Sequence, residues 1–314
     1  MKKMINATHV EGYLYEHNLE LKVTGERSKN PGTQFISGTV DIATDNAGLN
    51  IVSVHFTYVT ATTAAGKTNA TFTTLSNIIN ETLPSAMKHG KENATLLKID
   101  SAIGLNEFYS DKSGKEELIS VKRNEGGFVH VLPALDEDEG KRNTFDCDIV
   151  ITNCRRLEAN PQKNTPEKVI VKGAIFDFRG SLLPVEFSAV NERAMDYFED
   201  LCASPSNPVF TKVWGHQISE TVMKTTIEES AFGEPRITTT PITRKDWVIT
   251  GANTNTYEFG EEGVLTVAEL NEAIAKREID LAAMKARQDE YKASRNTAAT
   301  PAVTTPVAST GFKF

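Results

Sequence analysis

The fold is decided by the stretch Val209–Gly251, VFTKVWGHQISETVMKTTIEESAFGEPRITTTPITRKDWVITG. It contains two segments rich in β-branched and aromatic residues, 210–226 and 237–250. A turn around Gly233 and Pro235 separates them. Such residues favour strands, and Gly and Pro favour the turn between them. The stretch therefore predicts a long β-hairpin.

Both tryptophans lie in this hairpin, and each has cationic neighbours. Trp214 follows Lys212, and Trp247 follows Lys245. Aromatic faces among cationic side chains bind single-stranded nucleic acid, whereas large aromatics also serve as core anchors. We expect Trp247 in the core and Trp214 on a sheet face.

The composition predicts a β-rich globular protein. The chain has 314 residues, of which 39% are hydrophobic and 24% charged. This length accommodates two ordinary domains. Apolar residues fall in short runs bounded by Gly, Pro, Asn and Lys, which favours strands over helices. The net charge of −8 excludes a globally basic surface but is compatible with one basic face.

Cysteine usage and the N-terminal sequence favour the cytoplasm. Cys147, Cys154 and Cys202 form no CxxC pair and are odd in number. The start MKKMINATHVEG lacks the apolar region of a secretory signal, and no run approaches the length of a membrane span. We therefore expect no membrane association.

The first half of the chain predicts three strands, a helix and further strands, in that order. The first three strands are 12–24, 34–44 and 49–60, separated by the turn-forming segments ERSKNPG and DNAG. A helix over 71–83 follows, then two or three strands within 95–132. This is the order of an OB-fold, a small five-stranded barrel.

The same order recurs in the second half. Strands are predicted over 144–157, 168–178 and 182–190, followed by a helix over 192–201 that Asn191 caps. The hairpin described first supplies the last two strands. Such a recurrence is typical of a structural repeat.

The expected fold class is therefore mainly β, with two tandem OB-like domains followed by a C-terminal helix and a disordered tail. We place the first domain at 1–135, an acidic linker at 136–143, the second domain at 144–257, the helix at 258–295 and the tail at 296–314.

The end of the chain differs in character from the rest. A capping box, Thr266 and Glu269, begins an amphipathic helix. The Thr/Ala/Pro-rich tail that follows lacks the apolar residues needed to order itself. Its tip carries Phe312 and Phe314, which predict docking to a replication or recombination protein.

The sequence contains no pattern typical of catalysis or metal binding. It lacks a P-loop, GxGxxG, GxSxG and HExxH, and its six histidines have no second ligand at metal spacing. We expect no enzymatic activity, no metal and no cofactor.

One strand of the second domain suggests a nucleic-acid-binding face. Lys172, Phe176 and Phe178 alternate on the face opposite Val169 and Ile175. Base stacking would explain aromatic residues on the non-aliphatic face. A helix or the first domain packed over them is the alternative.

Other candidates follow the same logic of aromatic and cationic side chains on strands. The full set of predicted nucleic-acid-binding residues is Lys172, Phe176, Phe178, Lys212, Trp214, Arg155 and Arg156 in the second domain, and Phe35, His55 and Lys22 in the first. Arg179, Arg244 and Lys245 are further candidates for phosphate contacts.

The chain resembles the OB-fold single-stranded DNA-binding proteins of bacteriophages. The resemblance rests on GTVDIAT and NIVSVHFTYV in the first half, FTKVWGHQIS and EESAFGEP in the second, and the Pro/Thr-rich tail with aromatic residues at its tip. It implies sequence-independent coating of single-stranded DNA in replication, recombination or repair, without catalysis. A phage-encoded protein would act in the host cytoplasm.

A second hypothesis is a β-rich virion structural or assembly protein that binds no nucleic acid. The acidic charge and the Thr/Asn-rich strands fit it equally well. The sequence also leaves a homo-oligomer open. Particle size in the absence of nucleic acid would distinguish the two hypotheses.

Overall fold

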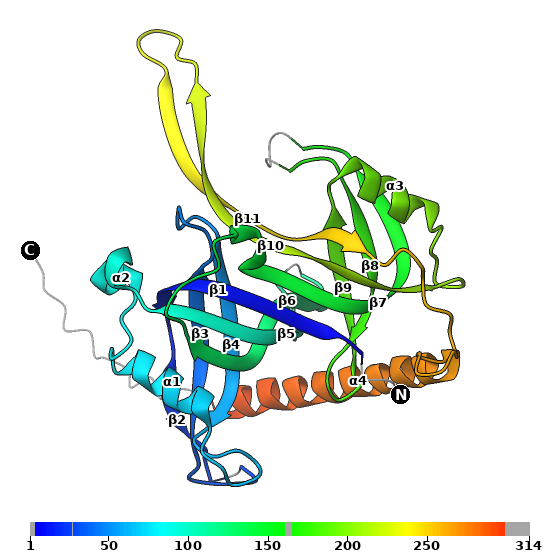
Figure 1. Cartoon of the computed structure of the whole chain (residues 1–314), viewed down its shortest axis with the longest axis horizontal. Helices are drawn as coiled ribbons and strands as arrows, with labels where there is room; N and C mark the ends of the chain where they lie inside the picture. The colour runs from blue at the N-terminus through cyan, green and yellow to red at the C-terminus, as the bar shows by residue number, and fades with distance from the viewer. Residues whose placement is uncertain (1–3, 27, 113, 161–164, 299–314) are drawn as a thin grey trace, which may run out of the picture.

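The computed structural model describes residues 4–298 except 27, 113 and 161–164 (Figure 1). The side chains of residues 220, 222, 242 and 294–298 are not described either. Phe312 and Phe314, with the predicted tail from residue 299 onward, lie outside the described residues.

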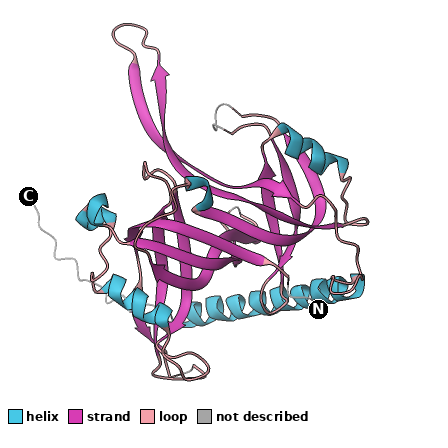
Figure 2. Cartoon of the chain, in the orientation of Figure 1, coloured by secondary structure: helices cyan, strands magenta, loops and turns pink. Residues whose placement is uncertain are grey.

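The described chain is mainly β, and its strands form one sheet with two barrels (Figure 2). The strands of the first half are β1 (Asn6–His17), β2 (Glu20–Val23), β3 (Gln34–Ala43), β4 (Ile51–Thr60), β5 (Leu96–Ser110) and β6 (Glu117–Val131). Those of the second half are β7 (Asn143–Leu157), β8 (Lys168–Phe176), β9 (Leu182–Ala189), β10 (Val209–Glu228) and β11 (Arg236–Ala252).

The helices lie between or after these strands. They are α1 (Ala70–Ile79), α2 (Ala86–His89), α3 (Glu192–Asp200) and α4 (Val267–Ala298), with the 3-10 turns Lys91–Asn93 and Glu139–Lys141.

The strand pairings of the first barrel are those of an OB-fold. β1 pairs antiparallel with β3 and β5, β3 pairs with β4, and β5 pairs with β6. β4 and β6 close the barrel in parallel, and α1 lies in the connection between β4 and β5. The expected strand order is confirmed.

The second barrel repeats this topology. β7 pairs antiparallel with β8 and β10, β8 with β9, and β10 with β11. β9 and β11 close the barrel through a parallel bridge between Ser188 and Val248, and α3 lies between β9 and β10. The prediction of two tandem OB-like barrels is therefore confirmed.

The two barrels share a continuous ladder. β1 pairs antiparallel with β7 from Asn6–Cys147 to Val10–Asn143. The segment between the barrels is also packed: Arg142 is 4% exposed, and its guanidinium donates to the carbonyl of Asp136 and to Asn46 Oδ1. The end of the segment predicted as a linker thus belongs to the barrel contact.

Each barrel buries its own aliphatic core. Val10, Val40, Val54 and Leu97 are fully buried in the first, where α1 adds Leu75. In the second, the core is formed by the inward faces of β7 to β11 and closed by Met195 and Phe198 of α3. Alternation of buried and exposed residues places one face of each strand in the core.

The helix caps agree with the sequence. Asn191 Oδ1 accepts from the Arg193 amide at 3.0 Å. Thr266 Oγ1 accepts from the Glu269 amide at 3.1 Å, and the Glu269 carboxylate accepts from the Thr266 amide at 3.0 Å. The predicted capping box is confirmed, although α4 extends beyond the predicted end of the helix.

Some strand boundaries differ from the expectation. The predicted strand 12–24 is divided into β1 and β2, with Asn18 between them accepting from the Thr39 amide at 2.5 Å. The last two strands predicted within 95–132 form one strand, β6, because Gly126 and Gly127 are accommodated in the ladder at positive φ. Glycine tolerates this conformation without the steric cost of a side chain.

α4 crosses both barrels. Leu265, just before α4, and Leu270, in its first turn, pack against the second barrel in the cluster around Phe176. Further along, Arg277 binds Glu107 of β5 at 2.5 Å, and the Gln288 side chain pairs with the backbone of Tyr109. α4 thus ties the β5–β6 hairpin to the second barrel (Figure 1). Over the residues described, no helix is both long and apolar enough to cross a membrane.

Candidate functional site

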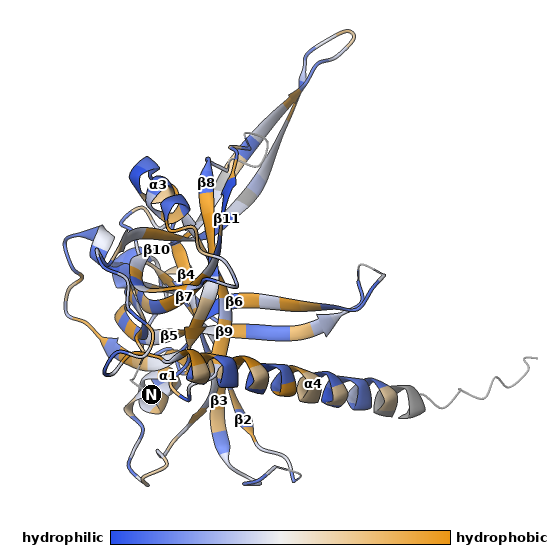
Figure 3. Ribbon diagram, turned by 90° about the vertical axis from the view of Figure 1, so that its right-hand side faces the viewer, coloured by the Kyte–Doolittle hydropathy of each residue, from blue (hydrophilic) through white to orange (hydrophobic). Residues whose placement is uncertain are grey.

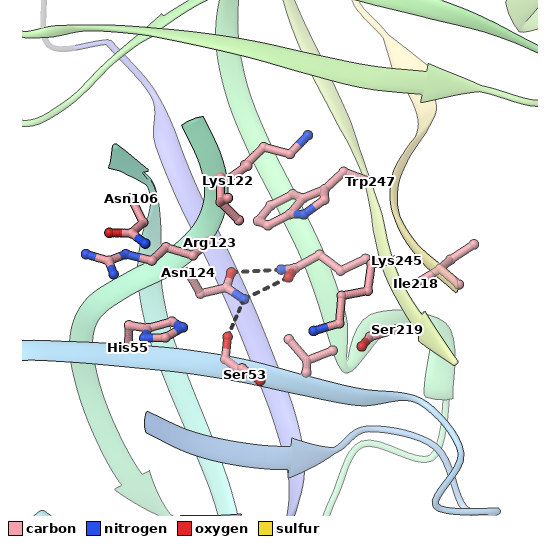
Figure 4. A pocket seen from close by; sticks show the side chains of 13 residues that line it. Ser53, His55, Asn106, Lys122, Arg123, Asn124, Ile218, Ser219, Lys245 and Trp247 are labelled. Atoms are coloured by element: carbon pink, nitrogen blue, oxygen red, sulfur yellow. Dashed lines mark hydrogen bonds between the residues drawn. The ribbon is translucent and has the colours of Figure 1, made fainter. Parts of the chain in front are cut away.

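A groove of about 190 Å³ lies where the two barrels meet (Figure 4). It is formed by β4 and β6 of the first barrel, β10 and β11 of the second, and Asn106 of β5. The residues that line it are Val52, Ser53, His55, Asn106, Val121, Lys122, Arg123, Asn124, Gln217, Ile218, Ser219, Lys245 and Trp247. The parallel β4–β6 closure of the first barrel and the root of the β10–β11 hairpin bring them together.

The groove is cationic. Lys122, Arg123 and Lys245 line it, and no carboxylate does so among the side chains that the structure describes. Two nearby acids are paired with cations: Glu125 binds the groove residue Arg123 at 3.0 Å, and Asp246 binds Lys168, outside the groove, at 2.6 Å. In a protein with a net charge of −8, the groove is therefore a local cationic surface, on which Glu125 offsets part of the charge of Arg123.

Lys122 is held against aromatic rings. Its Nζ lies 4.1 Å from the Phe187 ring centroid and 5.0 Å from that of Trp247, and it donates to the carbonyl oxygen of Glu186. Burial lowers the pKa of Lys122 to about 7, and the charge of Asp246 opposes this effect. Because a lysine with this pKa titrates near neutrality, the groove gains positive charge as the pH falls.

Trp247 is half-buried and has two roles. One side packs on the second core, where its ring centroid lies 5.5 Å from that of Phe145. The indole also lines the groove. The expectation that Trp247 is a core residue is thus correct for one side of the ring and incomplete for the other.

Two amides join the barrels at the floor of the groove. Asn124 of β6 and Gln217 of β10 donate to each other's side-chain oxygens at 2.7 and 2.9 Å. Asn124 also donates to the Ser53 carbonyl oxygen at 3.0 Å. Both side chains are nearly fully buried. Buried amides with satisfied hydrogen bonds fix the geometry around them, so the groove keeps its shape.

The outer face of the first barrel continues from the groove along β4. His55 lines the groove, and burial and the charge of Arg123 lower its pKa. Three residues further along the strand, roughly 10 Å away, Tyr58 is half-exposed and its ring centroid lies 4.7 Å from that of Phe35. Lys22 of β2 is opposite Phe35 in the ladder and binds Glu20 at 2.9 Å. An aromatic pair thus lies on the same barrel as the groove.

Comparison with models of protein families identifies the family of this chain. A model of the YorF family matches residues 4–287. The chain belongs to the YorF family. A search of curated proteins finds no match to this YorF-family chain.

The YorF-family chain is also similar to solved structures. The wild-type single-stranded DNA binding protein from Thermus aquaticus is 11% identical, with 82% of this chain and 97% of that chain covered and a TM-score of 0.43. A deletion mutant of the same protein is 12% identical, with 83% and 98% covered and a TM-score of 0.43. A replication protein A heterotrimer bound to single-stranded DNA is 10% identical, with 87% and 69% covered and a TM-score of 0.21.

In the structure of this YorF-family chain, Phe176 is not available for stacking on a base. It does lie on the face opposite Val169 and Ile175, as predicted, but it is fully buried. Leu265 and Leu270, at the start of α4, pack on that face. The prediction of an exposed Phe176 is therefore wrong, and the alternative of a helix packed over it is correct.

Phe178 and Lys172 are exposed but separated from the groove. Phe178 follows the end of β8 and is 84% exposed, with the Arg179 guanidinium 4.9 Å from its ring centroid. Lys172 binds Glu186 at 3.4 Å in a second cleft, between β8–β9 and the β5–β6 hairpin. The hairpin and Arg277 of α4 line this cleft too, so they partly cover this face of the second barrel.

The remaining predicted residues lie elsewhere on the second barrel. Lys212 binds Asp146 at 2.9 Å and has its Nζ 6.0 Å from the ring centroid of the partly exposed Trp214. Arg155 and Arg156 lie near the end of β7, where Arg156 binds Glu167 and Glu199. None of these predicted residues lines the groove. Among all the residues predicted to bind nucleic acid, His55 and the phosphate-contact candidate Lys245 do line it.

Several groove residues carry little signal in the sequence. Lys122 and Arg123 are adjacent in the sequence SVKRNE, and each alone is typical of a solvated surface charge. The KDW sequence at Lys245–Trp247 is the strongest available signal, since it places a cation and an aromatic side chain on one strand face. No cluster of three or more potential metal ligands occurs in the described part of the chain.

Proposed function

We propose that the protein binds single-stranded DNA in the groove between its barrels. The observation that carries the proposal is a groove that combines three cationic side chains with an indole and, among the described side chains, contains no carboxylate. Lys122, Arg123 and Lys245 would contact phosphates, and Trp247 would stack on a base. Stacking and phosphate contacts do not depend on sequence, so binding would be sequence-independent.

The size of the groove favours single strands over duplex. A cavity of roughly 150 Å³ accommodates a benzene-sized ring. The groove of about 190 Å³ therefore has room for one unstacked base, whereas paired and stacked bases would not enter. The Phe35–Tyr58 pair offers a second stacking surface for a strand that leaves the groove along β4.

Within this function we place the protein in DNA replication, recombination or repair, where single strands are exposed. The family resemblance to phage proteins supports a role in a phage life cycle. The protein would act by covering and positioning DNA, without catalysis.

The test is a fluorescence titration with single- and double-stranded oligonucleotides of equal length at two salt concentrations. We expect oligo-dT to quench tryptophan emission and the affinity to fall steeply with salt. The variants Trp214→Phe and Trp247→Phe show which tryptophan is quenched by DNA. Quenching should persist in Trp214→Phe and largely disappear in Trp247→Phe. Absence of quenching and of a mobility shift at low salt would disprove the proposal. Large assemblies without nucleic acid would favour a structural protein instead.

Binding is also expected to depend on pH through Lys122. The pKa of Lys122 is about 7 in the free protein, and a bound phosphate would raise it. Below pH 7 the ammonium is already charged, so the affinity is highest there and falls as the pH rises from 7 to 8.5. The lowered pKa of His55 places its titration below this window.

The measurement is the dissociation constant of oligo-dT at constant ionic strength across this pH range. Lys122→Arg keeps its charge and should bind with little pH dependence, while Lys122→Gln should bind weakly throughout. An unchanged pH profile in both variants would contradict the role of Lys122.

A further inference from the structure

The outer part of the β10–β11 hairpin extends beyond the second barrel as an arm, residues 221–243 (Figure 3). Its strands remain paired to Glu228–Arg236. Every described side chain of the arm is exposed. A two-stranded ribbon is at best marginally stable in water, so an arm of this length is expected to gain a contact in use.

The two faces of the arm differ. Thr221 and Thr243 are opposite each other and bring their hydroxyl oxygens within 3.1 Å, which fixes the register of one face. That face carries Met223, Ile227 and Ile237, each more than 60% exposed, together with Pro241 and threonines, and no charged residue. The opposite face carries Lys224, Glu228 and Arg236 together with threonines, and the register also assigns to it Val222 and Ile242, whose side chains are not described. We call the uncharged side the apolar face.

The chemistry of the apolar face indicates its partner. It offers no cation to a phosphate and no aromatic ring to a base, so it is poorly suited to DNA. It is uncharged along its whole length, so an identical face can pack on it without burying a charge. Packing of two such faces also directs the charged sides outward to solvent.

We propose that the apolar face of the arm packs against the same face of a second copy of this chain. The contact is isologous, since the same residues serve both partners. It contributes eight residues per copy. A standard interface uses about 20 to 30 residues on each side, so the contact is weak for freely diffusing molecules.

On DNA the same contact becomes effective, a consequence that rests on the proposed function. When two copies are bound to neighbouring sites on one strand, the strand links them. Each arm then experiences the other at an effective concentration of roughly millimolar, as for modules joined by a short linker. The arm would then make binding cooperative, while the groove continues to hold the DNA.

The first test is cross-linking without DNA. Thr225→Cys places a thiol on the apolar face and Thr226→Cys places one on the charged face, both in a Cys202→Ser background that removes the exposed native thiol. Under mild oxidation, Thr225→Cys should give several-fold more disulfide-linked dimer than Thr226→Cys. Equal yields, or no dimer from either variant, would overturn the proposal.

The second test compares oligo-dT that holds one copy with oligo-dT that holds two. Ile227→Lys, on the apolar face, should lower the cooperativity about tenfold and leave single-copy affinity unchanged. Thr226→Lys, with the same added charge on the other face, should retain cooperativity. Loss of single-copy affinity in Ile227→Lys alone would mean that the arm binds DNA, and would overturn the proposal.

The two tests separate the two hypotheses. If the wild-type chain binds no oligonucleotide, the proposed function fails, and the cross-linking result still decides whether the arms meet. Circular dichroism verifies that each variant retains the barrels, from which the arm is structurally separate.

Discussion

Lys245→Glu is expected to weaken oligo-dT binding about 10- to 100-fold at low salt. Lys245 is exposed at the groove and makes no ion pair with the described residues, so its replacement should leave the fold intact. The substitution removes an attractive charge and adds a repulsive one. The slope of log affinity against log salt should therefore become shallower by about 1 to 2.

The matched control is Arg193→Glu. Arg193 is exposed on α3, is not a groove residue, and undergoes the same change of charge. It should alter the affinity less than twofold. If both variants lost affinity equally, the effect would reflect net charge, and the groove would lose its assigned role.

Phe176→Ala is expected to lower the free energy of unfolding by about 3 to 5 kcal/mol. The ring is fully buried between the second barrel and the start of α4. Alanine would leave a cavity that the barrel strands cannot fill by shifting. The free energy of unfolding of a typical domain is only about 5 to 15 kcal/mol, so the expected loss is a large part of it. Urea unfolding monitored by circular dichroism gives the measurement.

Phe178→Ala is the companion variant, since Phe178 is two residues away and 84% exposed. It should change stability by less than about 0.5 kcal/mol. The folded fraction of Phe176→Ala should still bind oligo-dT normally. A stable Phe176→Ala protein with weakened binding would restore the stacking role and contradict the buried position.

The sequence predicts the barrels well because their signals are local. Turn-forming segments separate the strands, and alternation marks the core face of β8 through Val169 and Val171. Asn191 and the Thr266–Glu269 box specify helix starts through hydrogen bonds to residues two or three positions away.

The site is less predictable because its contacts are distant. Leu265 and Leu270 cover Phe176 from about 90 positions further along the chain, and alternation alone cannot distinguish a covered outer face from an open one. The groove depends on residues from both barrels, as the hydrogen bonds between Asn124 and Gln217 illustrate. The residues next to Arg123 in the sequence do not show that the second barrel lies beside it and makes it part of a site.

The contact between α4 and the β5–β6 hairpin has a consequence for synthesis. Tyr109 and Gln288, which hydrogen-bond to each other, are 179 residues apart. A ribosome adding about 5 to 20 residues per second needs roughly 10 to 35 s to make the intervening chain. During that time the nascent hairpin lacks the helix that ties it to the second barrel. We therefore expect early chain termination to yield aggregation-prone fragments, and slow translation to prolong dependence on chaperones.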